Sequence, residues 1–170
     1  MKNYPLAIKS FDEITKEFDL IYIITFKKNE EYANINDELF IELNRKFVLE
    51  LVASFEAKSV YFFKNFVKRR SSINVAYNSS ISINTRNAIK IGQKPLMYCH
   101  IIPVFKAIIQ PIDTTIYSDF IKLVEYRNWL AHGRGWDIDN NWKKIDFQYS
   151  LQIISSLMNN LPGYPDSLKK

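Results

Sequence analysis

The sequence has few of the residues that build metal centres and disulfide frameworks. Its 170 residues include one cysteine, Cys99, and two histidines, His100 and His132. An intramolecular disulfide framework and a cysteine-rich zinc site are therefore excluded. The apolar runs, such as residues 20–24, are far shorter than the ~20 residues that span a bilayer. No secretory signal pattern stands at the start, so we expect a soluble, cytoplasmic protein with no metal, no cofactor and no membrane partner.

Glycine and proline are also scarce, with four and six residues respectively. Neither occurs between Pro5 and Gly92, so nothing in that stretch must interrupt a helix. A length of 170 residues, 47% hydrophobic and 24% charged, is typical of one globular domain. We expect one domain over residues 1–170, with residues 161–170 as a C-terminal tail.

The first expected helix begins at Ser10, where Glu13 stands three residues further on in a capping-box arrangement. Its apolar positions recur at helical spacing, and Lys27 and Lys28 suit its C-terminal end. A longer helix is expected from Asn36 to about Arg70, with one strongly apolar face and acidic and basic residues at its two ends.

Three further helices are expected, over residues 95–109, 115–131 and 146–161. Pro103 should kink or divide the first of them, and Gly133 should end the second. Residues 71–84 are rich in serine and asparagine and are interpreted as a surface loop, with a short hairpin as the alternative. The sequence thus predicts an all-α fold, an up-and-down bundle of four or five helices.

The segment that carries chemistry is residues 124–136, which contains the string Arg-Asn-Trp-Leu-Ala-His-Gly. Arg127, Asn128 and His132 gather at the end of an otherwise apolar helix, with Asn128 and His132 one turn apart on one face. Histidine donates and accepts protons near neutral pH. An arginine fork fits phosphate oxygens and stabilises charge developing on them. The combination suits phosphodiester chemistry, and it needs no metal if RNA supplies its own 2′-hydroxyl as the nucleophile.

Two plainer interpretations stay open. The bare spacing of an arginine and a histidine five positions apart arises by chance in some chains of this composition. A histidine at a helix end also often caps the last carbonyls. The net charge of +5 permits a polyanionic partner, and it fits a merely basic surface equally well.

The sequence resembles the HEPN domain (higher eukaryotes and prokaryotes nucleotide-binding). The signature of that family is Arg, four to six residues, then His, commonly with Asn after the Arg. Arg127, Asn128 and His132 match it with four intervening residues. The resemblance extends to the expected all-α bundle with the motif on its penultimate helix. Polar residues within 54–56, in the middle of the long helix, are a weaker match to positions near the family's site.

The resemblance implies a metal-independent endoribonuclease of a toxin–antitoxin or antiphage-defence type. Such domains act as homodimers whose paired motifs form one composite site. Carried over, Arg127 would bind and polarise the scissile phosphate, His132 would serve in acid–base work or phosphate positioning, and Asn128 would hold the two in register. An antitoxin or regulatory protein is a further implied partner. Some of these toxins end the motif in His-x-Tyr; here Gly133 and Arg134 follow His132, so regulation through that tyrosine is not expected.

Additional candidates for RNA contacts lie outside the motif. Arg134 adds a cation next to it, and Lys68, Arg69 and Arg70 form a basic run that could follow an RNA backbone, although many such runs are solvated helix ends. Glu56 could assist by orienting a partner's arginine, with a surface salt bridge as an equal alternative.

Aromatic and nucleophilic residues give weaker candidates. Trp129, Trp136 and Trp142 could stack on RNA bases, but core packing or a dimer interface is favoured for Trp129. Cys99 and His100 are interpreted as core residues. Two alternatives to the nuclease remain: a HEPN-like module that binds RNA, a nucleotide or a protein without cleavage, and a helical interaction protein in which the motif only caps a helix.

Overall fold

The computed structural model describes residues 9–24, 36–68, 102, 105–106, 109–132 and 145–161. They form four helices: α1 (Phe11–Tyr22), α2 (Asn36–Lys68), α6 (Thr114–Ala131) and α7 (Phe147–Asn160). The described part contains no strand, which confirms the predicted all-α class. None of its helices has the length and apolar character needed to cross a membrane.

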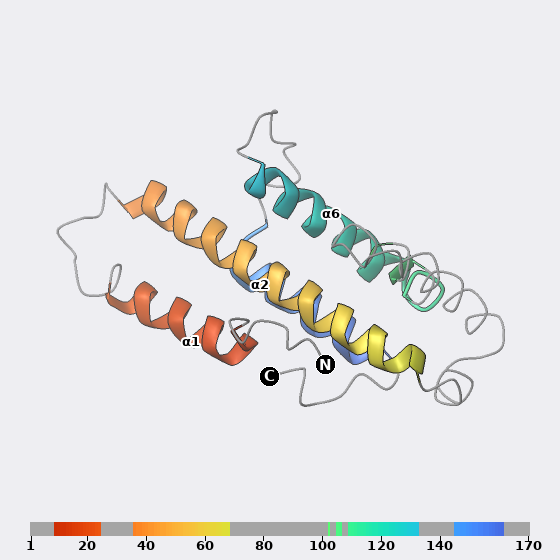
Figure 1. Cartoon of the computed structure of the whole chain (residues 1–170). Helices are drawn as coiled ribbons and strands as arrows, with labels where there is room; N and C mark the ends of the chain where they lie inside the picture. Colours follow the sequence, from red (N-terminus) through yellow and green to blue (C-terminus); the bar gives the residue numbers. More distant parts are fainter. Residues whose placement is uncertain are drawn as a thin grey trace.

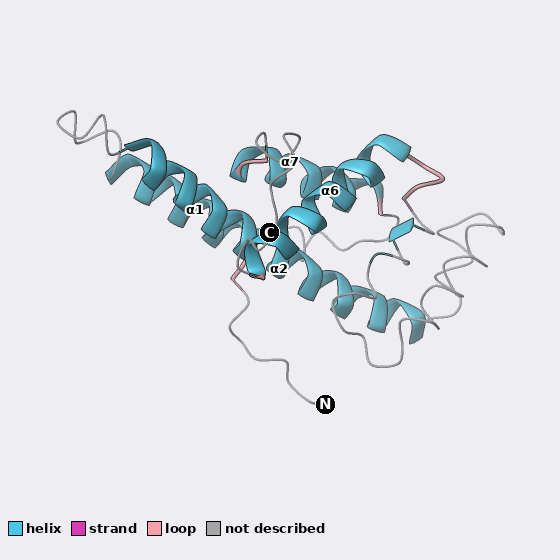
Figure 2. Ribbon diagram, turned by 90° about the horizontal axis from the view of Figure 1, so that it is seen from above, coloured by secondary structure: helices cyan, strands magenta, loops and turns pink. Residues whose placement is uncertain are grey.

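The long helix α2 is the centre of the arrangement (Figure 1), and α1, α6 and α7 all pack against it. Successive helices run in opposite directions along the chain. Trp129 lies near Arg45 and Phe120 near Phe55, so α6 runs antiparallel to α2. Seen from above, α6 and α7 lie side by side along α2 (Figure 2). The predicted helix bundle is therefore present in the described helices.

The helix starts follow from local hydrogen bonds. The Ser10 hydroxyl accepts from the N–H of Glu13 at 3.1 Å, and the Ser10 N–H donates to the Glu13 carboxylate at 2.7 Å. This is the predicted capping box. Asp113 accepts from two backbone N–H groups at the start of α6, and Asp146 accepts from the N–H of Tyr149 at 2.8 Å at the start of α7. Each cap satisfies donors that have no partner within the helix.

One end of the core is a cluster of three phenylalanines from three helices. Phe18 of α1, Phe47 of α2 and Phe147 of α7 have ring centroids between 4.3 and 5.9 Å apart, within the range of favourable aromatic pairs. The Asn44 side chain links α2 to α7. It donates to the Phe40 carbonyl on α2 at 3.0 Å and accepts from the N–H of Phe147 on α7 at 3.1 Å.

A second cluster lies further along α2. Phe55, Phe105 and Phe120 are fully buried, with centroids 4.8 to 5.9 Å apart. Phe105 comes from the predicted third helix: residues 102, 105 and 106 are helical, and residues 109–112 form a turn. The rest of that predicted helix, with Pro103, lies outside the described residues.

The observed bounds are close to the predicted ones. The second helix was expected over 36–70 and spans Asn36–Lys68, and the last was expected over 146–161 and spans Phe147–Asn160. The first helix begins after Ser10 as expected and spans Phe11–Tyr22, and residues 23–24 continue it in a π-helical turn. Lys27, Lys28, the predicted loop at 71–84 and Gly133 lie outside the described residues, as do residues 162–170 of the predicted tail. Leu161 itself is buried in the core.

Candidate functional site

The motif lies at the C-terminal end of α6. Ala131 is the last helical residue, and His132 is the cap, whose backbone N–H donates to the Asn128 carbonyl at 3.0 Å. The His132 side chain is exposed. The cap bond thus belongs to the backbone of His132, and its imidazole is accessible to a molecule in solution.

Arg127 is held by two side chains at its two terminal nitrogens. Nη1 donates to the Asn128 side-chain oxygen at 2.8 Å. Nη2 donates to Oε2 of Glu56 on the neighbouring helix α2, and the two side chains form an ion pair. The structure therefore brings together Arg127, Asn128 and Glu56, with His132 one helical turn beyond Asn128.

The ion pair is almost enclosed by protein. The Glu56 side chain is 1% exposed and the Arg127 side chain 16%. Burial raises the pKa of the Glu56 carboxyl, and the charge and hydrogen bond of Arg127 oppose that shift without cancelling it. Oε1 of Glu56 is buried, and no described group makes a hydrogen bond to it. Arg127 is therefore the group that makes a charged carboxylate tolerable at this position.

The location of Glu56 corrects one of the two sequence-based interpretations. A surface salt bridge is wrong, because the side chain is buried and its ion pair is with Arg127 of the same chain. Burial also places the carboxylate behind Arg127, so a direct role in binding substrate is not what the geometry favours. The sequence does carry a sign that Glu56 is buried. It lies four residues after Val52 and four before Val60, hence on the same face of α2 as these two buried valines.

Trp129 is a core residue, as favoured from the sequence. It is 3% exposed and stacks on Tyr126, with ring centroids 5.8 Å apart. The guanidinium of Arg45 lies over the Trp129 ring, 5.6 Å from its centroid. A base cannot stack on a ring that is covered in this way. Trp136, Trp142, Cys99 and His100 lie outside the described residues.

Of the predicted basic run Lys68, Arg69 and Arg70, Lys68 alone lies within the described residues. Lys68 is the last residue of α2, twelve residues beyond Glu56, which is about 18 Å along a helix axis. Because α2 and α6 run in opposite directions, the Lys68 end of α2 is the end remote from His132. Arg69, Arg70 and Arg134 lie outside the described residues.

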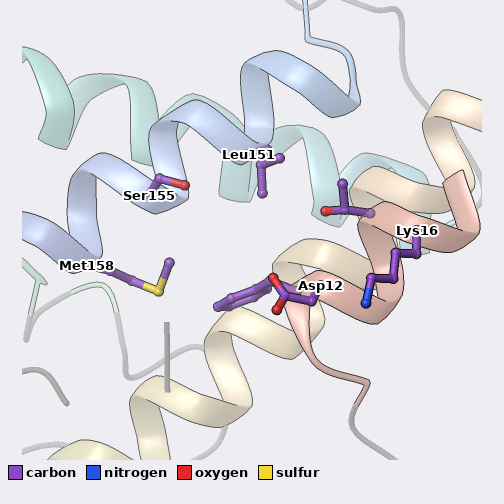
Figure 3. Close-up of a pocket in the computed structure, with 7 residues that line it drawn as sticks. Asp12, Lys16, Leu151, Ser155 and Met158 are labelled. Carbon is purple, nitrogen blue, oxygen red and sulfur yellow. The ribbon is translucent and has the colours of Figure 1, made fainter. Parts of the chain in front are cut away.

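A shallow groove lies elsewhere, between α1 and α7 (Figure 3). Phe11 and Met158 form part of its apolar lining, and Asp12 and Lys16 lie along its α1 side. None of its lining residues belongs to the motif. Among the residues that the structure describes, no three or more His, Cys, Asp or Glu side chains are grouped so as to hold a metal ion.

Comparisons of the chain with protein-family models, curated proteins and solved structures give no match. The residues at the end of α6, with Glu56 of α2, are therefore the features of this chain that bear on its function.

Proposed function

We propose that the protein is a metal-independent endoribonuclease of the HEPN type, acting in a toxin or antiphage-defence role. The observation that carries the proposal is the joint placement of three side chains at the end of α6. Arg127 is fixed against Asn128, and His132 is exposed one turn away. A helix cap alone needs only the backbone of His132 and has no use for an anchored arginine.

The chemistry that these groups support is internal transfer at an RNA phosphate. A base removes the proton of the 2′-hydroxyl, whose oxygen attacks the adjacent phosphorus. The 5′-oxygen leaves with a proton from an acid, which gives a 2′,3′-cyclic phosphate and a 5′-hydroxyl end. Histidine suits either proton transfer. A guanidinium stabilises the charge that develops on the phosphoryl oxygens.

The two proton transfers favour a composite site. Each chain supplies one motif histidine, so a homodimer would supply two around one phosphate. The paired sites must then be close, and a separation of His132 side chains above ~15 Å leaves no joint site. Spin labels at His132→Cys, in a Cys99→Ser background, measure this separation. A protein that stays monomeric at the concentration at which it cleaves RNA would contradict the dimer.

A second candidate is a non-catalytic module that binds RNA, a nucleotide or a regulatory protein such as an antitoxin. The observation that favours it is the engagement of Arg127 with Glu56, since the arginine side chain is 16% exposed. An arginine enclosed in this way can serve to stabilise the fold, whether or not it also takes part in a catalytic site. The two functions differ in whether RNA is cut or only retained.

The test is cleavage of total RNA by purified protein with chelator present throughout. His132→Ala and Arg127→Lys are compared with wild type, because lysine keeps a positive charge next to Glu56 but lacks the planar fork. Lys122→Ala is the matched control, since Lys122 is an exposed cation on α6 whose ion pair is with Asp119. We expect cleavage by wild type and the control and its loss in both motif variants.

Three other outcomes have distinct meanings. RNA that is shifted in a gel but never cut supports the binding module. Cleavage that survives both motif substitutions places the activity at another site and refutes the assignment. Cleavage that chelator abolishes refutes the metal-independent mechanism.

A further inference from the structure

Glu56 occupies a position where a carboxylate is unfavourable. It lies on α2 among buried residues, its side chain is 1% exposed, and burial raises the pKa of the carboxyl. An apolar side chain of similar volume generally packs at least as well in such a place as half of an ion pair. A contribution to the stability of the bundle therefore does not explain why a glutamate stands at position 56. Its contact with Arg127 explains it better.

We propose that Glu56 is a positioning residue, which orients the guanidinium of Arg127 from α2. This inference rests on the proposed function, because Arg127 is the group that would contact the phosphate. Glu56 itself would touch no RNA. It would act by holding the arginine in the orientation in which Asn128 also binds it.

The geometry explains how one carboxylate achieves this. Arginine has four side-chain torsions, and a single contact leaves the plane of its guanidinium free to turn. Here Nη2 is held by Glu56 and Nη1 by Asn128, so two contacts at different nitrogens define the plane. The two holders come from different helices, which makes the orientation depend on the packing of α6 against α2. A guanidinium with five N–H donors can hold these partners and a phosphate together.

An arginine fixed in this way is ready before RNA binds. Preorganised donors stabilise developing charge without reorganising at the moment of reaction. Loss of the anchor should therefore slow the chemical step more than it weakens RNA binding. Partners that orient metal ligands typically contribute about 10- to 100-fold, and we expect an effect of that order for a partner that orients an arginine.

The variant that tests the proposal is Glu56→Gln, which keeps the shape of the side chain and removes its charge. Glu50→Gln is the matched control: the same chemical change on the same helix, at a carboxylate whose partners Lys9 and Lys46 are on the surface. We expect kcat for RNA cleavage to fall about 10- to 100-fold in Glu56→Gln, with KM changed less than about twofold. Glu50→Gln should behave as wild type.

A second reading separates positioning from a general loss of structure. If Glu56 acts through Arg127, then Glu56→Gln should add no further loss to the residual cleavage rate of Arg127→Lys, measured at high enzyme concentration. Glu56→Asp provides a variant that keeps the charge but withdraws the carboxylate by one methylene. It should fold as wild type and still lose part of kcat.

A readout independent of catalysis keeps this inference distinct from the proposed function. Nitrogen-15 NMR observes the Nη protons of Arg127, assigned by their disappearance in Arg127→Lys. They should exchange slowly in wild type and in Glu50→Gln and become averaged in Glu56→Gln. Unchanged Arg127 signals in a folded Glu56→Gln protein would overturn the positioning role. If wild type cuts no RNA, the proposed function fails, while the NMR comparison still tests Glu56.

Discussion

Removal of Arg127 should destabilise the bundle through the charge that it leaves behind. In Arg127→Met the long side chain keeps most of its packing volume, but the Glu56 carboxylate loses the ion pair that the structure records. The carboxylate is 1% exposed, so water cannot replace the lost partner. We therefore expect a large loss of stability that the second substitution, Glu56→Gln, reverses.

The magnitude follows from the burial of the pair. Breaking a buried ion pair by removing one partner costs about 3–5 kcal/mol, whereas replacing both partners with uncharged groups is often neutral. Arg127 is 16% exposed, so the lower part of this range applies, about 3 kcal/mol. For a domain of this size 1 kcal/mol corresponds to about 2–4 °C in Tm, so we expect a decrease of about 6–12 °C. Out of a total stability of about 5–15 kcal/mol this is a substantial fraction.

The assay is urea unfolding followed by circular dichroism, with Tm by calorimetry, for wild type, both single variants and the double variant. The double variant should be at least about 1.5 kcal/mol more stable than Arg127→Met, because its buried charge is gone. The loss in Arg127→Met should also shrink at acidic pH, where Glu56 becomes protonated. A double variant no more stable than Arg127→Met would refute the reasoning, since it would mean that the carboxylate was not the source of the cost.

Four further predictions concern the same helices. Burial raises the pKa of the Glu56 carboxyl above its ordinary value of 4.5, so the folded state binds the carboxyl proton more tightly than the unfolded state. The stability that protonated Glu56 contributes is therefore present at low pH and is lost as the pH rises through the raised pKa. The free energy of unfolding of wild type should thus decline relative to Glu56→Gln as the pH rises above 4.5, and a constant difference would contradict this. Asn44→Ala should cost about 1–3 kcal/mol in urea unfolding, because it leaves the first N–H of α7 without its acceptor. Ser10→Ala should cost about 1 kcal/mol through loss of the cap on α1, with Ser10→Gly closer to wild type. His132→Ala should leave Tm unchanged, since the cap bond comes from its backbone.

Local features of the fold were predictable from the sequence because their causes are local. Ser10 and Glu13 are three residues apart and cap the same helix turn. The absence of glycine and proline between Pro5 and Gly92 allowed a helix as long as α2. The last helical residue of α6 is Ala131, as expected from the sequence. The C-cap is His132, one residue before Gly133.

The contacts that complete the candidate site were not predictable because they join distant parts of the chain. Glu56 and Arg127 are 71 residues apart in sequence; the core contact between Asn44 and Phe147, 103 residues apart, was unpredictable for the same reason. Periodicity places each residue on a face of its own helix, but it does not say which helix that face meets. The polar residues within 54–56 stood out from the sequence, yet only the packing of α2 against α6 shows that one of them is the partner of Arg127.

Arg127 and His132 differ in burial, so stability measurements can test the proposed function alongside activity measurements. Arg127 is enclosed and paired, so its loss affects stability and chemistry together. His132 is exposed, so its loss should affect chemistry alone. If the motif only capped a helix, the backbone bond would survive in His132→Ala, and neither substitution would change a reaction. Loss of cleavage in a His132→Ala protein of wild-type stability is therefore the result that a capping role cannot produce and that general acid–base catalysis requires.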